Sequence, residues 1–364
     1  MFYQTGIFSK YLSDPQMAAI VADEASIKRM LQFETSLAAA QATLGLIPNE
    51  AAAEIKEVLA GISINPGDLA AGTLQNGIPV VTLLELIKKN LSADTKKHLH
   101  FGSTSQDVVD TAQALMFNEA IELIESRIII LTQHLSKVID SYGSVPCMAR
   151  TRGQQAMPIT FGNKVSAWLQ PLQRQLQRLS EVKKRLLVVQ LGGAAGTLSA
   201  YPEKADELRV ALAKKLKLQP GFAWHTQRDN ISEFTNWLAM TTGVLGKMGG
   251  DVLVMAQSEI GEVAENEGGG KSSAMPHKNN PVLSEALVAI GKINAGLQSQ
   301  ILLGMIHVNE RDATAWILEW NAIPKMLINT GTSLNHALTI ASKINVNTDR
   351  MKKNVEQFLK NSDQ

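Results

Sequence analysis

The sequence has almost no cysteine: Cys147 is the only one in 364 residues. A single cysteine cannot form an internal disulfide, and this usage fits a reducing compartment. Net charge is nearly absent as well, at +1, so composition gives no electrostatic reason to expect nucleic acid or an anionic membrane surface as a partner. We therefore expect neither nucleic acid nor membrane among the partners.

Two further absences concern targeting. The N-terminus, MFYQTGIFSKYLSD, lacks the basic-then-apolar order of a signal peptide. No apolar run reads as long enough to span a bilayer. With 45% hydrophobic and 19% charged residues, the composition is that of a soluble globular protein, and we expect a cytoplasmic location.

Helical periodicity dominates what the sequence does contain. Residues 103–142 include neither Gly nor Pro, and a helix of this length would span roughly 60 Å. Six apolar residues within it are spaced 3, 4, 3, 4 and 3 apart, namely Ile121, Ile124, Ile128, Leu131, Leu135 and Val138. That spacing keeps one apolar stripe facing partner helices, so it predicts a helical bundle.

Further helices are expected on both sides of this segment, and no stretch reads as a run of alternating strands. The long ones cover 160–190, 230–263, 281–310 and 311–344, and shorter ones cover 24–44, 50–59 and 80–91. Pro171 and Pro324 are expected to kink or interrupt two of the long helices.

The fold class that this pattern predicts is all-α, with a long-helix bundle. We expect an N-terminal helical domain over 1–102, the central bundle over 103–344, and a short C-terminal helix and tail over 345–364. Long helices with apolar seams need neighbours to cover them, so a homo-oligomer is expected.

Three polar stretches interrupt the helical pattern. They read HLHFGSTSQDVVDT at 98–111, ARTRGQQAMPITFG at 149–162 and GGGKSSAMPHKNNP at 268–281. Hydroxyls and amides beside glycine, at the ends of long helices, offer many donors to an anionic ligand. For the first stretch, N-capping of the long helix by Ser103 or Thr104 is an equally good explanation.

The third stretch contains Gly-Lys-Ser, which ends the pattern of a phosphate-binding loop. That pattern requires glycine six residues before the lysine, where this chain has Glu265. The preceding residues, 251–263, also read as a helix rather than a buried strand. A nucleotide site is therefore not expected, and the three glycines are interpreted as a hinge for a closing loop.

Together the three stretches resemble the fumarase/aspartase superfamily. Residues 272–281 match its motif G-S-S-x-M-P-x-K-x-N-P except that Lys271 stands at the glycine position. TSQD at 104–107, and Arg-Thr with Ala-x-Pro within 150–158, resemble its other two conserved regions. The resemblance implies an all-α homotetramer whose active sites each draw on three subunits. The superfamily usually adds a third, C-terminal domain, which we expect to be largely missing here.

Within the superfamily, the pattern resembles the branch that cyclises a tricarboxylate, 3-carboxy-cis,cis-muconate, without a cofactor. The pieces that carry this are RTRGQQAMPITFG, QLGGAAGT at 190–197, WHTQRDNISEF at 224–234, SEIGEVAE at 258–265 and NERDATAWILEW at 309–320. Adenylosuccinate lyase is the nearest alternative, but it uses a histidine where Arg152 stands and another near 77–80, where there is none. A non-catalytic helical scaffold is the alternative outside enzymes.

The resemblance also implies residue roles. Ser272 matches the catalytic serine, the acid in the addition direction, whose hydroxyl needs tuning by backbone N–H groups and a nearby cation. Lys278 and Asn280 match the carboxylate-binding pair, and Lys271 or Lys278 could supply the cation. Ser272 and Lys278 are thus the expected catalytic residues.

Other residues are expected to bind the remaining carboxylates. The candidates are His100, Thr104, Ser105, Gln106, Arg150, Thr151, Arg152 and Arg228. A buried arginine that braces helices would look the same as a binding Arg228. Glu285 is expected to pair with Arg152 in place of a proton relay. No metal site is expected, because the His98-x-His100 pair lacks a third ligand at a sensible spacing.

Overall fold

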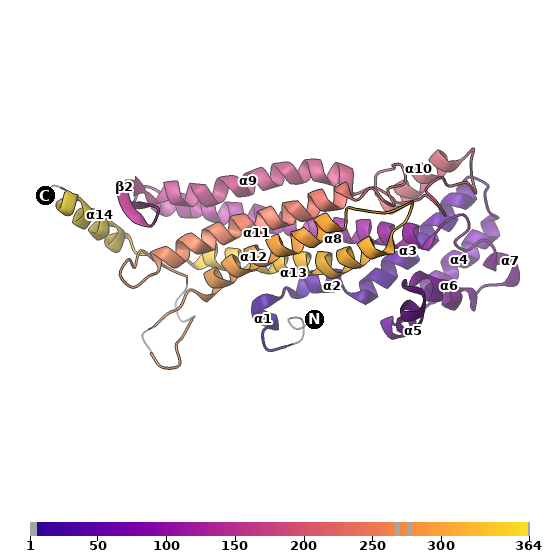
Figure 1. Cartoon of the computed structure of the whole chain (residues 1–364), viewed down its shortest axis with the longest axis horizontal. Coiled ribbons are helices and arrows are strands. Elements are labelled where there is room, and N and C mark those ends of the chain that lie inside the picture. The colour runs from indigo at the N-terminus through magenta and orange to yellow at the C-terminus, as the bar shows by residue number, and fades with distance from the viewer. Residues whose placement is uncertain (1–5, 266–269, 276–277, 363–364) are drawn as a thin grey trace.

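The computed structural model of the protein describes residues 6–265, 270–275 and 278–362. It is an elongated, mostly helical molecule, so the predicted all-α class is confirmed (Figure 1). The first seven helices are α1 (Ser9–Leu12), α2 (Pro15–Ile20), α3 (Asp23–Thr43), α4 (Asn49–Gly61), α5 (Pro66–Asn76), α6 (Val80–Lys88) and α7 (Ala93–Lys96). Helices α3 to α7 gather at one end of the molecule (Figure 1).

The remaining helices build the long body of the molecule. They are α8 (Ser105–Tyr142), α9 (Phe161–Leu186), α10 (Ala205–Leu216), α11 (Asp229–Met255), α12 (Val282–Leu303), α13 (Ala313–Lys343) and α14 (Thr348–Ser362). Helices α8, α9, α11, α12 and α13 run side by side along the long axis (Figure 1). The apolar stripe of α8 is confirmed, since all six of its residues are at most 7% exposed.

Two apolar cores stabilise this arrangement. One runs along the bundle and contains large buried side chains such as Trp168, Phe234 and Trp237. The other fills the end of the molecule around Phe33 of α3, and it also takes Leu208 and Leu212 from α10. Its residues are therefore not contiguous in the sequence, because α10 folds back against α3.

The two internal prolines do not interrupt their helices. Pro171 lies inside α9 and Pro324 inside α13, and both helices continue through them, so an interruption is wrong. A proline removes one backbone hydrogen bond, but burial of an apolar face supplies most of a helix's stability. In α9 that face includes Trp168 and Leu172 on either side of the proline.

Short strands occur where none were expected. In the described part of the chain, β1 (Pro146–Thr151) pairs antiparallel with β2 (Gln154–Thr160), and β3 (Val263–Ala264) pairs with β4 (Asn345–Val346). Arg152 and Gly153 form the turn of the first hairpin, with positive φ angles of 54° and 84°. The long helix expected to reach residue 263 ends at Met255, and the chain continues into β3.

Helix α12 contradicts the expectation about membrane-spanning runs. It has 22 residues and a mean hydropathy of 1.2, long and apolar enough to cross a membrane by length and composition alone. It packs against α11 and α13 within the bundle, where Leu287, Ile290 and Ile301 are buried. Such a test rests on length and composition alone, and in the single chain one side of α12 packs into the bundle while Ile293 and Leu302 are exposed.

Candidate active site

The first two polar stretches lie at opposite ends of helix α8. The first stretch, 98–111, contains the start of α8 at Ser105, and the second follows the end of α8 at Tyr142. With 38 residues, α8 separates them by about 57 Å at ~1.5 Å per residue. Figure 1 shows the same separation, with α3 and α10 at one end and β2 and α14 at the other. One chain therefore does not bring Thr104 and Arg152 together.

The second and third stretches are closer to each other. Arg150 Nη1 lies 3.6 Å from Glu262 Oε2, at the start of the segment that leads through β3 into the third stretch. Thr151 and Arg152 are exposed at the tip of the hairpin. The expected pair between Arg152 and Glu285 is not formed within the part of the chain that the structure describes, where both side chains are exposed.

At the first stretch, Thr104 caps α8 in a capping box with Asp107. The buried Asp107 was not singled out from the sequence, although the pattern T-x-x-D before an apolar helix signals such a box. Its carboxylate accepts hydrogen bonds from the backbone N–H groups of Gly192 (2.8 Å) and Gly193 (2.9 Å). His225 Nε2 lies 2.9 Å from the same carboxylate. Asp107 thus ties the first stretch to QLGGAAGT and WHTQRDN.

The side chain of Gln106 is not available to a substrate in the single chain, so a contribution of Gln106 through its backbone N–H stays a prediction. Its side chain is 0% exposed, and Nε2 donates to Asp110 Oδ2 at 3.0 Å and to the carbonyl of His225 at 2.8 Å. Both donors are therefore used inside the chain. Thr104 and Ser105 are half-buried and stay candidates for carboxylate binding.

Arg228 is a buried arginine that braces helices, which is the alternative to substrate binding that the sequence left open. It is 2% exposed, and its guanidinium contacts Asp110 Oδ2 at 2.7 Å and Glu319 Oε1 at 2.8 Å. The guanidinium carbon lies 4.9 Å from the centre of the Trp224 ring. Burial holds the pKa of Glu319 above its usual value, although Arg228 counteracts that rise. The expected role of Arg228 as a substrate ligand is therefore corrected.

The third stretch gives Ser272 part of the environment that its chemistry needs. Ser272 Oγ accepts hydrogen bonds from the backbone N–H groups of Ala274 at 3.3 Å and Met275 at 3.2 Å. Such donors stabilise a serine oxygen that gives up its proton. Lys278 is exposed, and its backbone N–H donates to the carbonyl of Met275 at 3.0 Å. Lys271 is exposed and forms a single antiparallel bridge with Asn279.

The ends of this stretch are fixed by two side chains. Asn280 donates from Nδ2 to the carbonyl of Gly270 at 2.8 Å. Glu265, the residue that argued against a phosphate loop, accepts from the backbone N–H groups of Leu283 (3.1 Å) and Ser284 (2.5 Å) at the start of α12. A carboxylate thus occupies a helix N-terminus, a position suited to an anion. Of the expected hinge, Gly268 and Gly269 lie outside the described residues.

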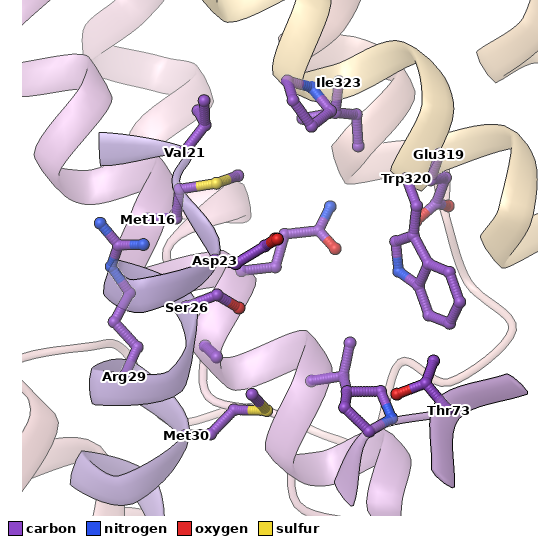
Figure 2. A pocket seen from close by; sticks show the side chains of 15 residues that line it. Val21, Asp23, Ser26, Arg29, Met30, Thr73, Met116, Glu319, Trp320 and Ile323 are labelled. Atoms are coloured by element: carbon purple, nitrogen blue, oxygen red, sulfur yellow. The ribbon is translucent and has the colours of Figure 1, made fainter. Parts of the chain in front are cut away.

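One cavity lies at the third stretch and another lies elsewhere in the molecule. One of about 250 Å³ lies at the base of the third stretch and is lined by Glu265, Asn280 and Pro281 with residues of β3 and β4. The other, of about 280 Å³, lies between α3, α8 and α13, away from Ser272. Figure 2 shows Asp23 and Trp320 facing it from α3 and α13. This second cavity contains none of the expected site residues.

His100 lies in the loop before α8 with a positive φ of 60°. Its Nδ1 is 2.6 Å from Glu34 Oε1 on α3. The side chain is 15% exposed, so it is accessible from the same end of the molecule as Thr104. Glu34 was not singled out from the sequence, where it is one acidic residue within a long helical pattern.

Comparison with known proteins gives consistent matches. A sequence model of a lyase family matches residues 10–293. The chain is 35% identical over 355 residues to 3-carboxy-cis,cis-muconate cycloisomerase of Pseudomonas aeruginosa, covering 96% of this chain and 77% of that protein. It is 33% identical over 354 residues to trans-aconitate decarboxylase 1 of Mycosarcoma maydis, covering 96% and 72%. The crystal structure of 3-carboxy-cis,cis-muconate lactonizing enzyme from Pseudomonas putida matches with a TM-score of 0.91 at 35% identity, over 97% of this chain and 80% of that one.

Proposed function

The chain belongs to the lyase family, and from that premise we propose that it is a cycloisomerase that converts 3-carboxy-cis,cis-muconate to a carboxymuconolactone. The structural observation that carries the proposal is the hydroxyl of Ser272, which accepts two backbone N–H groups inside the matched motif. This conversion is a step in the breakdown of protocatechuate, so the proposal places the enzyme in aromatic catabolism. Its substrate is a small tricarboxylate.

The reaction makes one C–O bond and one C–H bond. A carboxylate oxygen of the substrate adds to a carbon of the conjugated double bond, and the electron pair moves to the neighbouring carbon and into its carboxyl group. Ser272 delivers the proton to that carbon, and the N–H groups of Ala274 and Met275 stabilise the serine oxygen that remains. A proton from solvent restores Ser272, so each turnover takes up one proton overall.

Lys278 supplies positive charge for the carboxyl group into which the electrons move. Charge placed where negative charge develops lowers the barrier more than charge placed on the substrate's resting carboxylates. Asn280 holds the loop closed through Gly270, and Lys271 adds a second cation beside Ser272 in the sequence. We assign Ser272 and Lys278 as the catalytic residues on this basis.

We also propose that the site is completed by other copies of the chain in a cytoplasmic homotetramer. The ~57 Å between the two ends of α8 means that the first and second stretches can serve one site only if different copies supply them. Large apolar side chains on the bundle surface support an oligomer, because Met240, Ile293 and Leu302 are 37%, 50% and 53% exposed in the single chain. An Arg152–Glu285 pair would then join two subunits.

The direct test is to mix the purified protein with 3-carboxy-cis,cis-muconate and follow the loss of diene absorbance in the ultraviolet. Wild-type protein is expected to turn over, and Ser272→Ala to lose at least about a hundredfold in kcat, as expected for removal of a general acid. Ser273→Ala is the matched control, because Ser273 is an exposed neighbour in the same motif. No turnover by the wild-type protein refutes the proposal, and an equal loss in both variants refutes the role of Ser272.

A further inference from the structure

We propose that Glu34 is a positioning residue that holds His100 with its Nε2 directed at a substrate carboxylate as a hydrogen-bond donor. The inference rests on the proposed function, because it assumes a carboxylated substrate beside Thr104 and Ser105. It assigns a role to a residue on α3, outside all three polar stretches.

The contact between the two side chains is short and buried. Glu34 is 1% exposed, and its Oε1 lies 2.6 Å from His100 Nδ1. The other carboxylate oxygen, Oε2, is buried and has no hydrogen-bond partner among the described residues. A buried carboxylate is costly unless it is paired, and His100 is the partner that this structure provides. The pair therefore fixes the proton of His100 on Nδ1.

Fixing that proton leaves the other ring nitrogen for the ligand. When Nδ1–H is donated to a carboxylate and the ring is protonated, Nε2 also carries a hydrogen and acts only as a donor. Nε2 makes no hydrogen bond to any residue within the described ranges, and the His100 side chain remains 15% exposed. Such a group suits an anion, and carboxylates are the anions of the proposed substrate.

The loop around His100 is held by the same helix. Gln41 lies seven residues after Glu34, on the same face of α3, and its Nε2 donates to the carbonyl of Phe101 at 2.7 Å. The hydroxyl of Tyr201 donates to that carbonyl too, at 2.9 Å. A Cβ at Gly102 would approach the Tyr201 ring to 2.3 Å, so only glycine fits there. These contacts fix His100 relative to Thr104, four residues later.

The surrounding charges favour the protonated ring. Burial by itself lowers the pKa of His100. The negative charge of Glu34, the hydrogen bond to Glu34 and the charge of Asp107 on α8 together raise the pKa by more than burial lowers it. Lys88 on α6 acts in the opposite direction, and the net pKa lies above that of a free histidine. Because the folded pKa is raised, the charge on His100 is lost only as the pH rises through this higher value.

The test measures the ring itself as well as turnover. In the full-length protein, NMR titration of the histidine ring signals gives the pKa of His100, with the signal assigned by its loss in His100→Asn. Glu34→Gln is expected to lower that pKa by about one unit or more, because it removes the attracting charge while keeping the shape. Glu50→Gln is the control, because Glu50 is an exposed glutamate on α4. An unchanged pKa in Glu34→Gln overturns the proposal.

Turnover provides a second readout. KM for 3-carboxy-cis,cis-muconate is expected to rise about tenfold in Glu34→Gln with a smaller change in kcat, and the pH at which KM rises should move down with the pKa of His100. Glu34→Asp keeps a carboxylate, so it should show a smaller rise in KM and a smaller shift of the pH dependence of KM than Glu34→Gln. It also serves as the test variant if Glu34→Gln does not fold. If wild-type protein turns over and neither variant changes KM or its pH profile, the role of Glu34 is refuted. If wild-type protein does not turn over, the proposed function fails, and the NMR titration still decides whether Glu34 controls His100.

Discussion

Asn280 closes the third stretch on Gly270 with two hydrogen bonds to one carbonyl, from its backbone nitrogen at 2.9 Å and from Nδ2 at 2.8 Å. Ser272 lies inside the loop that these bonds close. Gly270 has a φ of 64°, and a Cβ there would lie 1.9 Å from the backbone oxygen of Asn280. The glycine next to Lys271 therefore permits a close approach of two backbone segments, which is a different task from cradling a phosphate.

Gly270→Ala is expected to impair the loop while the bundle stays folded. The left-handed backbone costs an L-residue about 1–2 kcal/mol, and the clash with Asn280 adds to that cost. We expect kcat/KM to fall at least about tenfold, with little change in the melting temperature, because the described residues of the loop contribute no large buried side chain. Gly243→Ala in α11 is the control, since nothing lies within 4 Å of its new methyl group. Equal activity of the two variants would contradict the closed-loop geometry.

Mixing two inactive variants tests whether sites are shared between subunits. Ser272→Ala damages the third stretch and Arg152→Ala the second, and in the proposed tetramer these stretches come from different chains. After unfolding and refolding together in equal amounts, about a quarter of the sites should receive both intact stretches if subunits combine at random. Activity is measured against each variant refolded alone. No recovery in a mixture that forms mixed oligomers would contradict the shared site.

Arg228 should matter more for stability than for substrate binding. Replacing it with Met leaves the buried carboxylates of Asp110 and Glu319 without their cation, which typically costs about 3–5 kcal/mol. The free energy of unfolding in urea, at fixed protein concentration, measures this loss. Arg185→Met is the matched control: its pair with Glu233 is solvent-exposed, so a much smaller loss is expected. A small effect at Arg228 would show that the buried pairs are replaceable.

The single thiol reports on folding through its pKa. Burial, the main cause, raises the pKa of Cys147 to about 11. Near pH 8 the folded thiol is therefore almost entirely protonated, and its labelling rate should be roughly a hundredfold or more below that of the unfolded chain. The check is the labelling rate with and without denaturant. Rapid labelling of the native protein would show that Cys147 is reached without unfolding.

The same shift predicts a pH dependence of stability. Because the folded pKa is raised above the ordinary thiol value of 9.0, the unfolded thiol loses its proton first as the pH rises. Between pH 9 and 11 the unfolded state therefore binds fewer protons, and stability should fall with rising pH. Comparing this slope with that of Cys147→Ala measures the contribution of the thiol. An identical slope in both proteins would contradict the raised pKa.

Local patterns in the sequence determined much of the fold. The stripe from Ile121 to Val138 has the helical period, which depends only on residues near one another in the chain, and all six of its residues are buried. The capping position of Thr104 follows from Asp107 three residues later. The exclusion of a phosphate loop at Glu265 is likewise a matter of spacing, and the motif around Ser272 is contiguous in the sequence.

The tertiary structure alone decided which of these residues can act together. The hairpin of 146–160 has too short a pattern to stand out beside long helices, and its turn at Arg152 is stabilised by pairing across the strands. Burial of Gln106 and Arg228 depends on helices far apart in the chain, so their residue types did not reveal it. The pairing of Glu34 with His100 joins residues 66 positions apart. Sequence spacing carries no information about such contacts, because they form only when segments far apart in the chain pack together.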